Sequence, residues 1–181
     1  MQRIPATDPS KAFGKTKERL DAIQKKIGRV PNIHATMANS PAVLSAYLCL
    51  SEALSHSSLD EKLSELLAVA VASANDCEYC LSAHTATGKD LNIDQSALAR
   101  AQEGASHDPK TRAALRFARK LVFNRGKVSD EDVAELRTVG FSNAAILEIV
   151  ALTVMNIFTN YTNHVASTEV DFPRAAAAAP R

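Results

Sequence analysis

The chain has 181 residues, of which 46% are hydrophobic and 23% charged, and its formal net charge is +1. This length and composition predict one globular domain with a core of its own. The near-zero charge gives no indication of binding to nucleic acid or to an anionic membrane. Tryptophan is absent and aromatic residues make up 5% of the chain, which argues against a surface that stacks bases.

No targeting segment is evident. The N-terminal sequence Met1–Pro5 lacks an apolar stretch, so we expect no signal peptide. The longest apolar run, residues 144–158, is interrupted by Glu148 and Asn156 and is too short to cross a bilayer. Three cysteines are an odd number and do not suit a framework of structural disulfides. We therefore expect a cytoplasmic protein that has no membrane or nucleic-acid partner.

Helical periodicity begins near the N-terminus. Residues 10–27 are predicted to form an amphipathic helix that ends at Gly28. A short helix is expected over residues 34–39, and Ser40 followed by Pro41 is typical of a helix start. That helix is predicted to reach about His56. The apolar residues that define the face of the first helix are Phe13, Leu20, Ile23 and Ile27.

The middle of the chain predicts two consecutive helices. Ser58 and Glu61 have the spacing of a capping box, in which each side chain bonds the other's backbone amide. The helix that follows runs to Ser73 and is nearly all apolar after Glu65, so we expect it at the centre of the fold. The pair Asn75-Asp76 is predicted to cap the next helix, which reaches about Gly88.

Further helices are predicted over residues 94–103, 109–124, 129–140 and 142–165. No segment has strand periodicity, and there is no glycine-rich phosphate loop. The prediction is an all-α, single-domain helical bundle that comprises residues 1–174. Residues 175–181 form an alanine-rich, low-complexity C-terminal tail.

The residues with the strongest chemical character lie in the two central helices. On a helix, Cys77, Cys80 and His84 fall within roughly 60° of one another on a single face. Glu65 lies twelve positions upstream in an apolar segment, where an ionisable group needs a task or a partner. Two thiols, an imidazole and a carboxylate indicate a redox site. Cys49 stands in an apolar phrase and is interpreted as a small core residue.

Each of these groups suits a peroxide cycle. The amides and dipole at a helix start favour the thiolate of Cys77, and Cys80 is close enough to exchange a disulfide with it. His84 can exchange protons with Cys80, and Glu65 could orient His84 or pass protons. A sulfenic acid formed on one cysteine can be condensed by the other. The helix dipole alone favours Cys77 as the attacking cysteine.

The pattern Glu-x11-Cys-x-Tyr-Cys-x3-His resembles the signature of the AhpD-like alkylhydroperoxidases, within the carboxymuconolactone decarboxylase superfamily. The phrases at residues 30–32, 40–42 and 163–173 resemble its peroxidase-related branch. The resemblance covers about residues 29–173. It implies an AhpD-like helical bundle with the Cys-x-x-Cys motif at a helix N-terminus.

The same resemblance implies that Cys80 attacks the peroxide, that Cys77 resolves the product, and that Glu65 and His84 form the proton relay. It also implies a small hydroperoxide as substrate, a dithiol reductant as partner and a homo-oligomer, either a trimer or a hexamer. No cofactor and no metal are predicted. Tyr79 stands where the best-known members have histidine, which implies a shorter relay and a weaker or redirected activity.

Three alternatives remain open. A zinc site could use the two thiolates, His84 and Glu65, and the chain could be a redox-sensing or metal-binding helical module without enzymatic activity. A decarboxylase of the carboxymuconolactone type is the third, although such members generally lack the cysteine pair. Tyr79, as a pocket wall or a proton donor, and His164 are secondary site candidates. The histidines at positions 34, 56 and 107 are predicted to be solvated.

Overall fold

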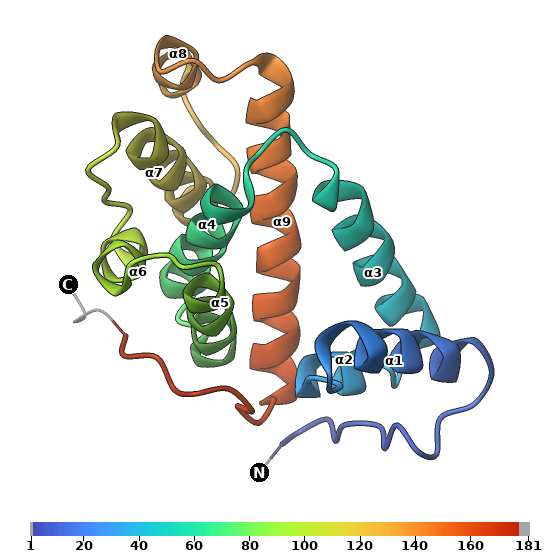
Figure 1. Cartoon of the computed structure of the whole chain (residues 1–181). Coiled ribbons are helices and arrows are strands. Elements are labelled where there is room, and N and C mark those ends of the chain that lie inside the picture. Colours follow the sequence, from blue (N-terminus) through green and yellow to red (C-terminus); the bar gives the residue numbers. More distant parts are fainter. Residues whose placement is uncertain (1, 178–181) are drawn as a thin grey trace.

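A computed structural model describes residues 2–177 of the chain. Over this range the protein is all-helical, with nine helices and no strand (Figure 1), which confirms the predicted fold class. The helices are α1 (Gly14–Ile27), α2 (Asn32–Met37), α3 (Pro41–Ser55), α4 (Glu61–Ala74), α5 (Glu78–Asp90), α6 (Gln95–Gln102), α7 (Pro109–Phe123), α8 (Asp130–Thr138) and α9 (Asn143–Ala166).

Helix α4 is the centre of the molecule, as its apolar sequence predicted. It packs against α5, α6, α7 and α9, and every residue from Leu67 to Ala72 is buried. A helix that is apolar on all sides has no face to offer water, so it is stable only when neighbours cover it all round. Burying a leucine or valine side chain fully contributes about 1.5–3 kcal/mol.

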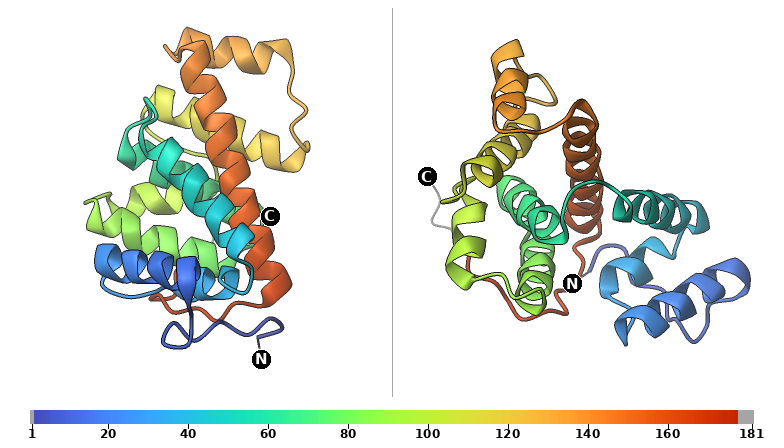
Figure 2. Two further views of the ribbon diagram at one scale, coloured as in Figure 1. Left: turned by 90° about the vertical axis from the view of Figure 1, so that its right-hand side faces the viewer. Right: turned by 45° about the horizontal axis from the view of Figure 1, so that its top comes forward.

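Helix α9 runs the length of the molecule beside α4 (Figures 1 and 2). Its 24 residues, Asn143–Ala166, are long and apolar enough to cross a membrane by length and composition alone, and its bounds agree with the helix predicted over residues 142–165. In the fold, one side of α9 packs against α3, α4, α5 and α7. That side also carries buried polar residues, Asn156, Thr159, Asn160 and Asn163. This packing is that of a core helix.

Helices α1, α2 and α3 gather on one side of the molecule (Figure 2). The first helix begins at Gly14, later than predicted, because Phe13 has extended backbone at the N-cap. The side chain of Phe13 is 87% exposed and does not join the apolar face of the helix. On α3 only Leu44 is fully buried. Cys49, on the same helix, is exposed, so its interpretation as a core residue is wrong. The apolar phrase around Cys49 belongs to a helix with few neighbours.

Two predicted helix caps are also wrong. Asp60, not Ser58, caps α4, and its carboxylate accepts from the amide of Leu63 at 2.9 Å. A charged acceptor adjacent to the first turn interacts better with the helix dipole than a more distant hydroxyl does. Ser58 instead donates to Glu148 on α9, with 2.5 Å between the oxygens. Ser40 caps α3 as predicted, and Asp94, Asp108 and Ser142 cap α6, α7 and α9 at the predicted starts of those helices.

The chain after α9 returns across the first turn of α5 (Figure 1). Ser167 ends α9 in a left-handed conformation, with φ of 51°. Arg174 then pairs with Glu78 at 2.8 Å, and the amide of Ala175 donates to the Ser82 hydroxyl. The predicted tail, residues 175–181, therefore begins against the bundle, and its residues 178–181 lie outside the described part.

Candidate active site

The cysteine pair lies at the junction of α4 and α5. Asp76 adopts a left-handed φ of 53°, and the amide of Cys77 donates back to the carbonyl of Ala72 on α4. This tight reversal makes Cys77 itself the N-cap of α5, so the predicted cap at Asn75-Asp76 is wrong. The sulfur of Cys77 accepts from the amide of Cys80 at 3.3 Å. The two helices thus form a hairpin with both cysteines at its turn.

Cys77 and Cys80 are joined by a disulfide, with their Cα atoms 5.3 Å apart. Both residues are buried, each with 3% of its surface exposed. One helical turn brings their side chains together because residues i and i+3 share a face. The pair therefore forms a disulfide that is enclosed within the bundle.

Glu65 and His84 form an ion pair beside the cysteines. The Nδ1 atom of His84 on α5 is 2.8 Å from Oε2 of Glu65 on α4. Burial disfavours the charged imidazolium, yet the Glu65 carboxylate and hydrogen bonds to Glu65 and Asn156 outweigh it, so the pKa of His84 is raised. His84 therefore keeps its proton to a higher pH than a free histidine does.

A pocket of about 180 Å³ lies against Cys80, Glu65 and His84. Cys80 lines this pocket and Cys77 does not. Its walls are mostly apolar or aromatic, which suits a small organic molecule. The wall residues include Ile27, Pro31, Ile33, Tyr47, Tyr79 and Phe172.

Tyr79 forms part of this wall. Its hydroxyl accepts from the amide of Ile33 at 3.1 Å, and its ring meets the edge of Phe172 with 5.7 Å between centroids. Burial is the main reason that the pKa of Tyr79 is raised, so its phenol holds its proton. Phe172 is fixed in turn by Arg29, which stacks on its ring and pairs with Asp171 at 2.5 Å.

His34 is buried, with 8% of its surface exposed, so the prediction of a solvated histidine is wrong. The helix it belongs to, α2, packs against α3 and α9 and carries the histidine into the pocket wall. Burial lowers the pKa of His34 to about 4, although Asp171 opposes the shift. The imidazole is therefore neutral at physiological pH, and its Nδ1 atom has no hydrogen-bond partner in the described structure.

His164 lies outside the pocket. Its Nε2 atom is 2.9 Å from the carbonyl of Asn75, and its side chain is exposed. The neighbouring residue, Asn163, is the one that reaches the site: its Nδ2 atom is 3.2 Å from the sulfur of Cys80. His164 was a secondary candidate because residues 163–173 resemble the peroxidase-related branch of the family.

A row of polar residues on α9 was missed by the sequence analysis. Asn156, Thr159, Asn160 and Asn163 recur at helical spacing and are all buried. Asn156 contributes to the charge state of His84, and Asn160 accepts from Asn75 at 2.8 Å. The sequence could have indicated this row, because it places three amides and a hydroxyl on one face of an otherwise apolar helix. Such groups are buried only where they have hydrogen-bond partners or a function.

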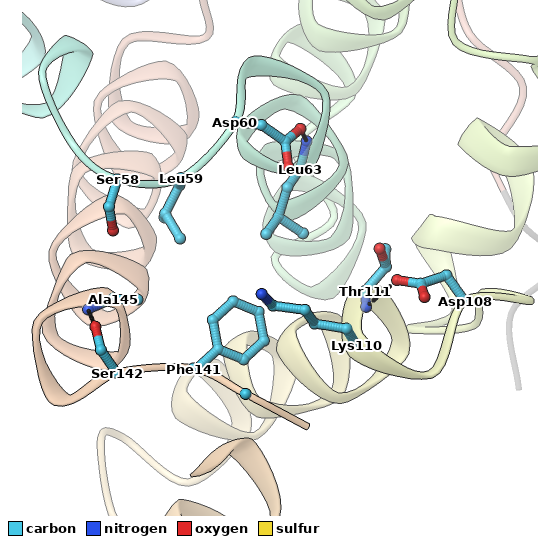
Figure 3. Close-up of a pocket in the computed structure, with 11 residues that line it drawn as sticks. Ser58, Leu59, Asp60, Leu63, Asp108, Lys110, Thr111, Phe141, Ser142 and Ala145 are labelled. Carbon is cyan, nitrogen blue, oxygen red and sulfur yellow. Dashed lines mark hydrogen bonds between the residues drawn. The ribbon is translucent and has the colours of Figure 1, made fainter. Parts of the chain in front are cut away.

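A second cavity, of about 270 Å³, lies where α4, α7 and α9 begin (Figure 3). Its most prominent polar groups cap these helices: Asp60, Asp108 and Ser142 each accept from a backbone amide of the first turn. Lys110 extends over the ring of Phe141. These groups are occupied in holding helix ends, so the cavity contains no comparable reactive cluster. Among residues 2–177, no group of three or more His, Cys, Asp or Glu side chains is placed to hold a metal ion.

The fold and site define a class of protein: an all-helical bundle in which a Cys-x-x-Cys pair opens a helix beside a partly buried Glu–His pair. Residues 41–120 match the model of the carboxymuconolactone decarboxylase family. This match and the similar solved structures support the resemblance to this family, and the chain has the AhpD-like fold that the resemblance predicted. No curated protein sequence matches the chain significantly.

Several solved structures are similar over nearly the whole chain. A peroxidase-related protein from Ralstonia eutropha JMP134, described as an alkylhydroperoxidase AhpD core, is 26% identical with a TM-score of 0.85, covering 94% of this chain and 92% of its own. A peroxidase-related protein from Silicibacter sp. TM1040 is 28% identical with a TM-score of 0.80, covering 92% and 91%. The debrominase Bmp8 is 22% identical with a TM-score of 0.80, covering 93% and 91%.

Proposed function

We propose that this protein is a thiol-dependent peroxidase that reduces small hydroperoxides through a Cys77–Cys80 dithiol–disulfide cycle. One observation carries the proposal. Cys80 forms a disulfide with Cys77 and also lines a pocket that contains the Glu65–His84 ion pair. A nucleophile and a proton donor thus adjoin one small, mostly apolar space, and the resolving cysteine is bonded to the nucleophile behind it.

In the proposed cycle the Cys80 thiolate attacks the terminal oxygen of the hydroperoxide. A sulfur–oxygen bond forms, the oxygen–oxygen bond breaks, and the alkoxide leaves with the electron pair. The imidazolium of His84 gives it a proton, so the products are an alcohol and a sulfenic acid on Cys80. The Cys77 thiolate then attacks that sulfur, hydroxide leaves and is protonated to water, and the disulfide remains.

The position of the two sulfurs supports Cys80 as the attacking cysteine. The helix dipole favours a thiolate at Cys77, which is the N-cap. Cys77 does not line the pocket, however, whereas Cys80 does. We therefore assign the attack to Cys80, because access to the substrate outweighs the effect of the helix dipole. This assignment agrees with the roles that the family resemblance implies.

A dithiol reductant must reopen the disulfide by exchange. Both cysteines are only 3% exposed, so the reductant's thiolate reaches Cys80 through the pocket and displaces Cys77. Such a cycle needs a reducing compartment, which is why we place the protein in the cytoplasm. The Ralstonia and Silicibacter relatives are peroxidase-related, which supports the same reaction class.

We also propose that the protein is a homo-oligomer, a trimer or a hexamer. Large apolar side chains stand exposed along α9, at intervals of seven residues and then four. A continuous apolar stripe on a long helix is unfavourable in water unless a second surface covers it. The stripe comprises Leu147, Val154, Tyr161 and Val165, which are 54–69% exposed.

Peroxide consumption with dithiothreitol as reductant tests the proposal. The Cys80→Ser variant should lose turnover, because no thiolate faces the pocket. The Cys77→Ser variant should complete one turnover and stop at a sulfenic acid, which a dimedone adduct detects by mass spectrometry. The Cys49→Ser variant is the matched control, since this cysteine is exposed on α3, and it should retain full activity. Full turnover by Cys80→Ser would refute the proposal.

A second candidate is thiol-dependent removal of bromine from a halogenated aromatic compound. Bmp8 has the same fold, and one of its structures contains 2,3,4-tribromopyrrole. The aromatic walls of the pocket, Tyr47, Tyr79 and Phe172, favour a flat ring. In this reaction two thiols become a disulfide while carbon–bromine becomes carbon–hydrogen and bromide. Bromide release from a brominated pyrrole, without turnover of hydroperoxide, would favour it over the peroxidase.

A further inference from the structure

Asn163 has an unusual environment for a buried amide. Only 4% of its surface is exposed, and its Nδ2 atom is 3.2 Å from the sulfur of Cys80. Its Oδ1 atom is buried and has no hydrogen-bond partner in the described structure. Leaving a buried acceptor without a partner is unfavourable, because the acceptor has lost its hydrogen bonds to water. A native structure rarely retains such a group without a reason.

The side chain is held firmly in this position. Asn163 lies in the last turn of α9, and its own carbonyl accepts from the amides of Ser167 and Thr168 where the helix ends. Asn163 also lines the pocket against Cys80. The contact joins α9 to α5 across 83 positions of sequence. The packing of the bundle therefore keeps the amide at the sulfur and at the edge of the cavity.

The chemistry of a thiolate selects the orientation of this amide. A thiolate has lone pairs and no proton, so it is stabilised by an N–H donor and destabilised by a carbonyl oxygen. The NH₂ group therefore faces Cys80, and Oδ1 is left to accept from something else. An amide that donates at one end and accepts at the other matches a reactant pair consisting of a thiolate and an O–H group.

We infer that Asn163 is a catalytic residue: its NH₂ group stabilises the Cys80 thiolate while its Oδ1 atom accepts the O–H of a bound hydroperoxide. The inference deepens the proposed function and rests on it for the second contact. The hydrogen-bonded oxygen is the terminal one, which Cys80 attacks. Its hydrogen stays with it as the sulfur–oxygen bond forms, and the alkoxide that leaves takes its proton from His84.

The first test measures the thiolate and needs no peroxide. In the Cys77→Ser background, the pKa of Cys80 is read from the pH dependence of its alkylation by iodoacetamide. Asn163→Ala removes the donor and should raise this pKa. Asn163→Asp places a negative charge at the sulfur and should raise it by about one unit or more. Thr162→Val is the matched control, because its hydroxyl bonds the Phe158 carbonyl instead, and it should leave the pKa unchanged.

The second test measures kcat/KM for tert-butyl hydroperoxide in the Cys77-containing protein. Loss of both contacts in Asn163→Ala should lower kcat/KM by about a hundredfold, as removal of a preorganised donor does elsewhere. Circular dichroism checks that each variant is folded, and the alanine variant suffices if the aspartate variant is not.

The two tests separate the inference from the proposed function. An unchanged Cys80 pKa and an unchanged kcat/KM in Asn163→Ala would overturn the inference while the peroxidase stands. A raised pKa in a protein that consumes no peroxide even as wild type would refute the peroxidase. In that case the role of Asn163 at the sulfur would still be supported.

Discussion

At the scale of single residues, the site depends on histidines whose environments differ sharply. His84 has a carboxylate partner, and its pKa is raised. His34 is buried, has no partner at Nδ1, and its pKa is lowered to about 4. Two imidazoles in the wall of one pocket therefore have pKa values that are shifted in opposite directions. One can give a proton, and the other remains a neutral polar group.

Buried His34 should make the protein sensitive to acid. Between pH 6.5 and about 4 the unfolded chain binds a proton at His34 and the folded chain does not. Stability is therefore lost as pH falls through this window, by roughly 3 kcal/mol in all for this one group. Urea unfolding of wild type and His34→Gln at several pH values measures the difference. His56→Gln, at an exposed histidine, is the control and should keep the wild-type slope.

The Glu65–His84 pair should set the alkaline limit of activity. Because the folded pKa of His84 is raised, the stabilisation from its charge is complete below about pH 6.5. It is lost as pH rises through the folded value. Glu65→Gln removes the carboxylate, so the pKa of His84 falls and the alkaline limb of peroxide turnover moves to lower pH. At neutral pH turnover should fall by about tenfold to a hundredfold.

A matched pair on the surface controls this experiment. Glu52 and His56 likewise form a Glu–His pair, with 3.5 Å between their atoms, but these two residues are four positions apart in sequence and both are exposed. Glu52→Gln should leave the pH–rate profile unchanged. An alkaline limb that stays in place in Glu65→Gln would show that His84 is not the proton donor.

At the scale of elements, the hairpin of α4 and α5 positions the whole site. The turn at Asp76 sets Cys77 as N-cap, the first turn of α5 brings Cys80 to it, and the next turn aligns His84 with Glu65 on α4. The chain after α9 fastens this first turn through Arg174 and Ala175. Site geometry therefore depends on how closely α5 packs against its neighbours.

Gly88 permits that close packing between α5 and α6. A Cβ atom at this position would lie 2.7 Å from Cδ2 of Leu98, whose side chain is fully buried and has little freedom to move. Gly88→Ala should therefore lower the free energy of unfolding by about 1–3 kcal/mol, even though alanine is the better helix former by up to about 1 kcal/mol. Chemical denaturation measures this.

The double variant Gly88→Ala, Leu98→Ala tests the reason. If the clash with Leu98 is the cause, the alanine at position 98 makes room, and the two changes destabilise less than their sum. A Gly88→Ala protein with a higher free energy of unfolding than wild type would contradict this prediction. It would show that α5 and α6 can move apart without a loss of stability.

At the scale of the whole molecule, the exposed apolar stripe on α9 should form the subunit contact. Val154→Glu places a charge at its middle and should convert the oligomer to monomer, because burying an unpaired carboxylate is unfavourable. Light scattering after size exclusion reports the mass. Phe13→Glu is the control, since Phe13 is 87% exposed but lies at the start of α1. A monomeric wild-type protein would contradict the proposed oligomer.

Local sequence was sufficient for most of the fold. The nine helices were predicted with ends correct to within a few residues, because periodicity and capping depend on neighbours within one or two turns. The spacing of Cys77, Cys80 and His84 on one face follows from the same local geometry. The errors at Ser58 and Asn75-Asp76 arose where several suitable cap residues stood side by side.

Tertiary packing decided what periodicity leaves open. Which faces are covered is a property of distant partners, so Cys49 in an apolar phrase is exposed and His34 in the short helix α2 is buried. The same packing brings Asn163 to Cys80 from 83 positions away, although His164 beside it points elsewhere. A helix's sequence specifies its own faces, but only the assembled bundle specifies what each face meets.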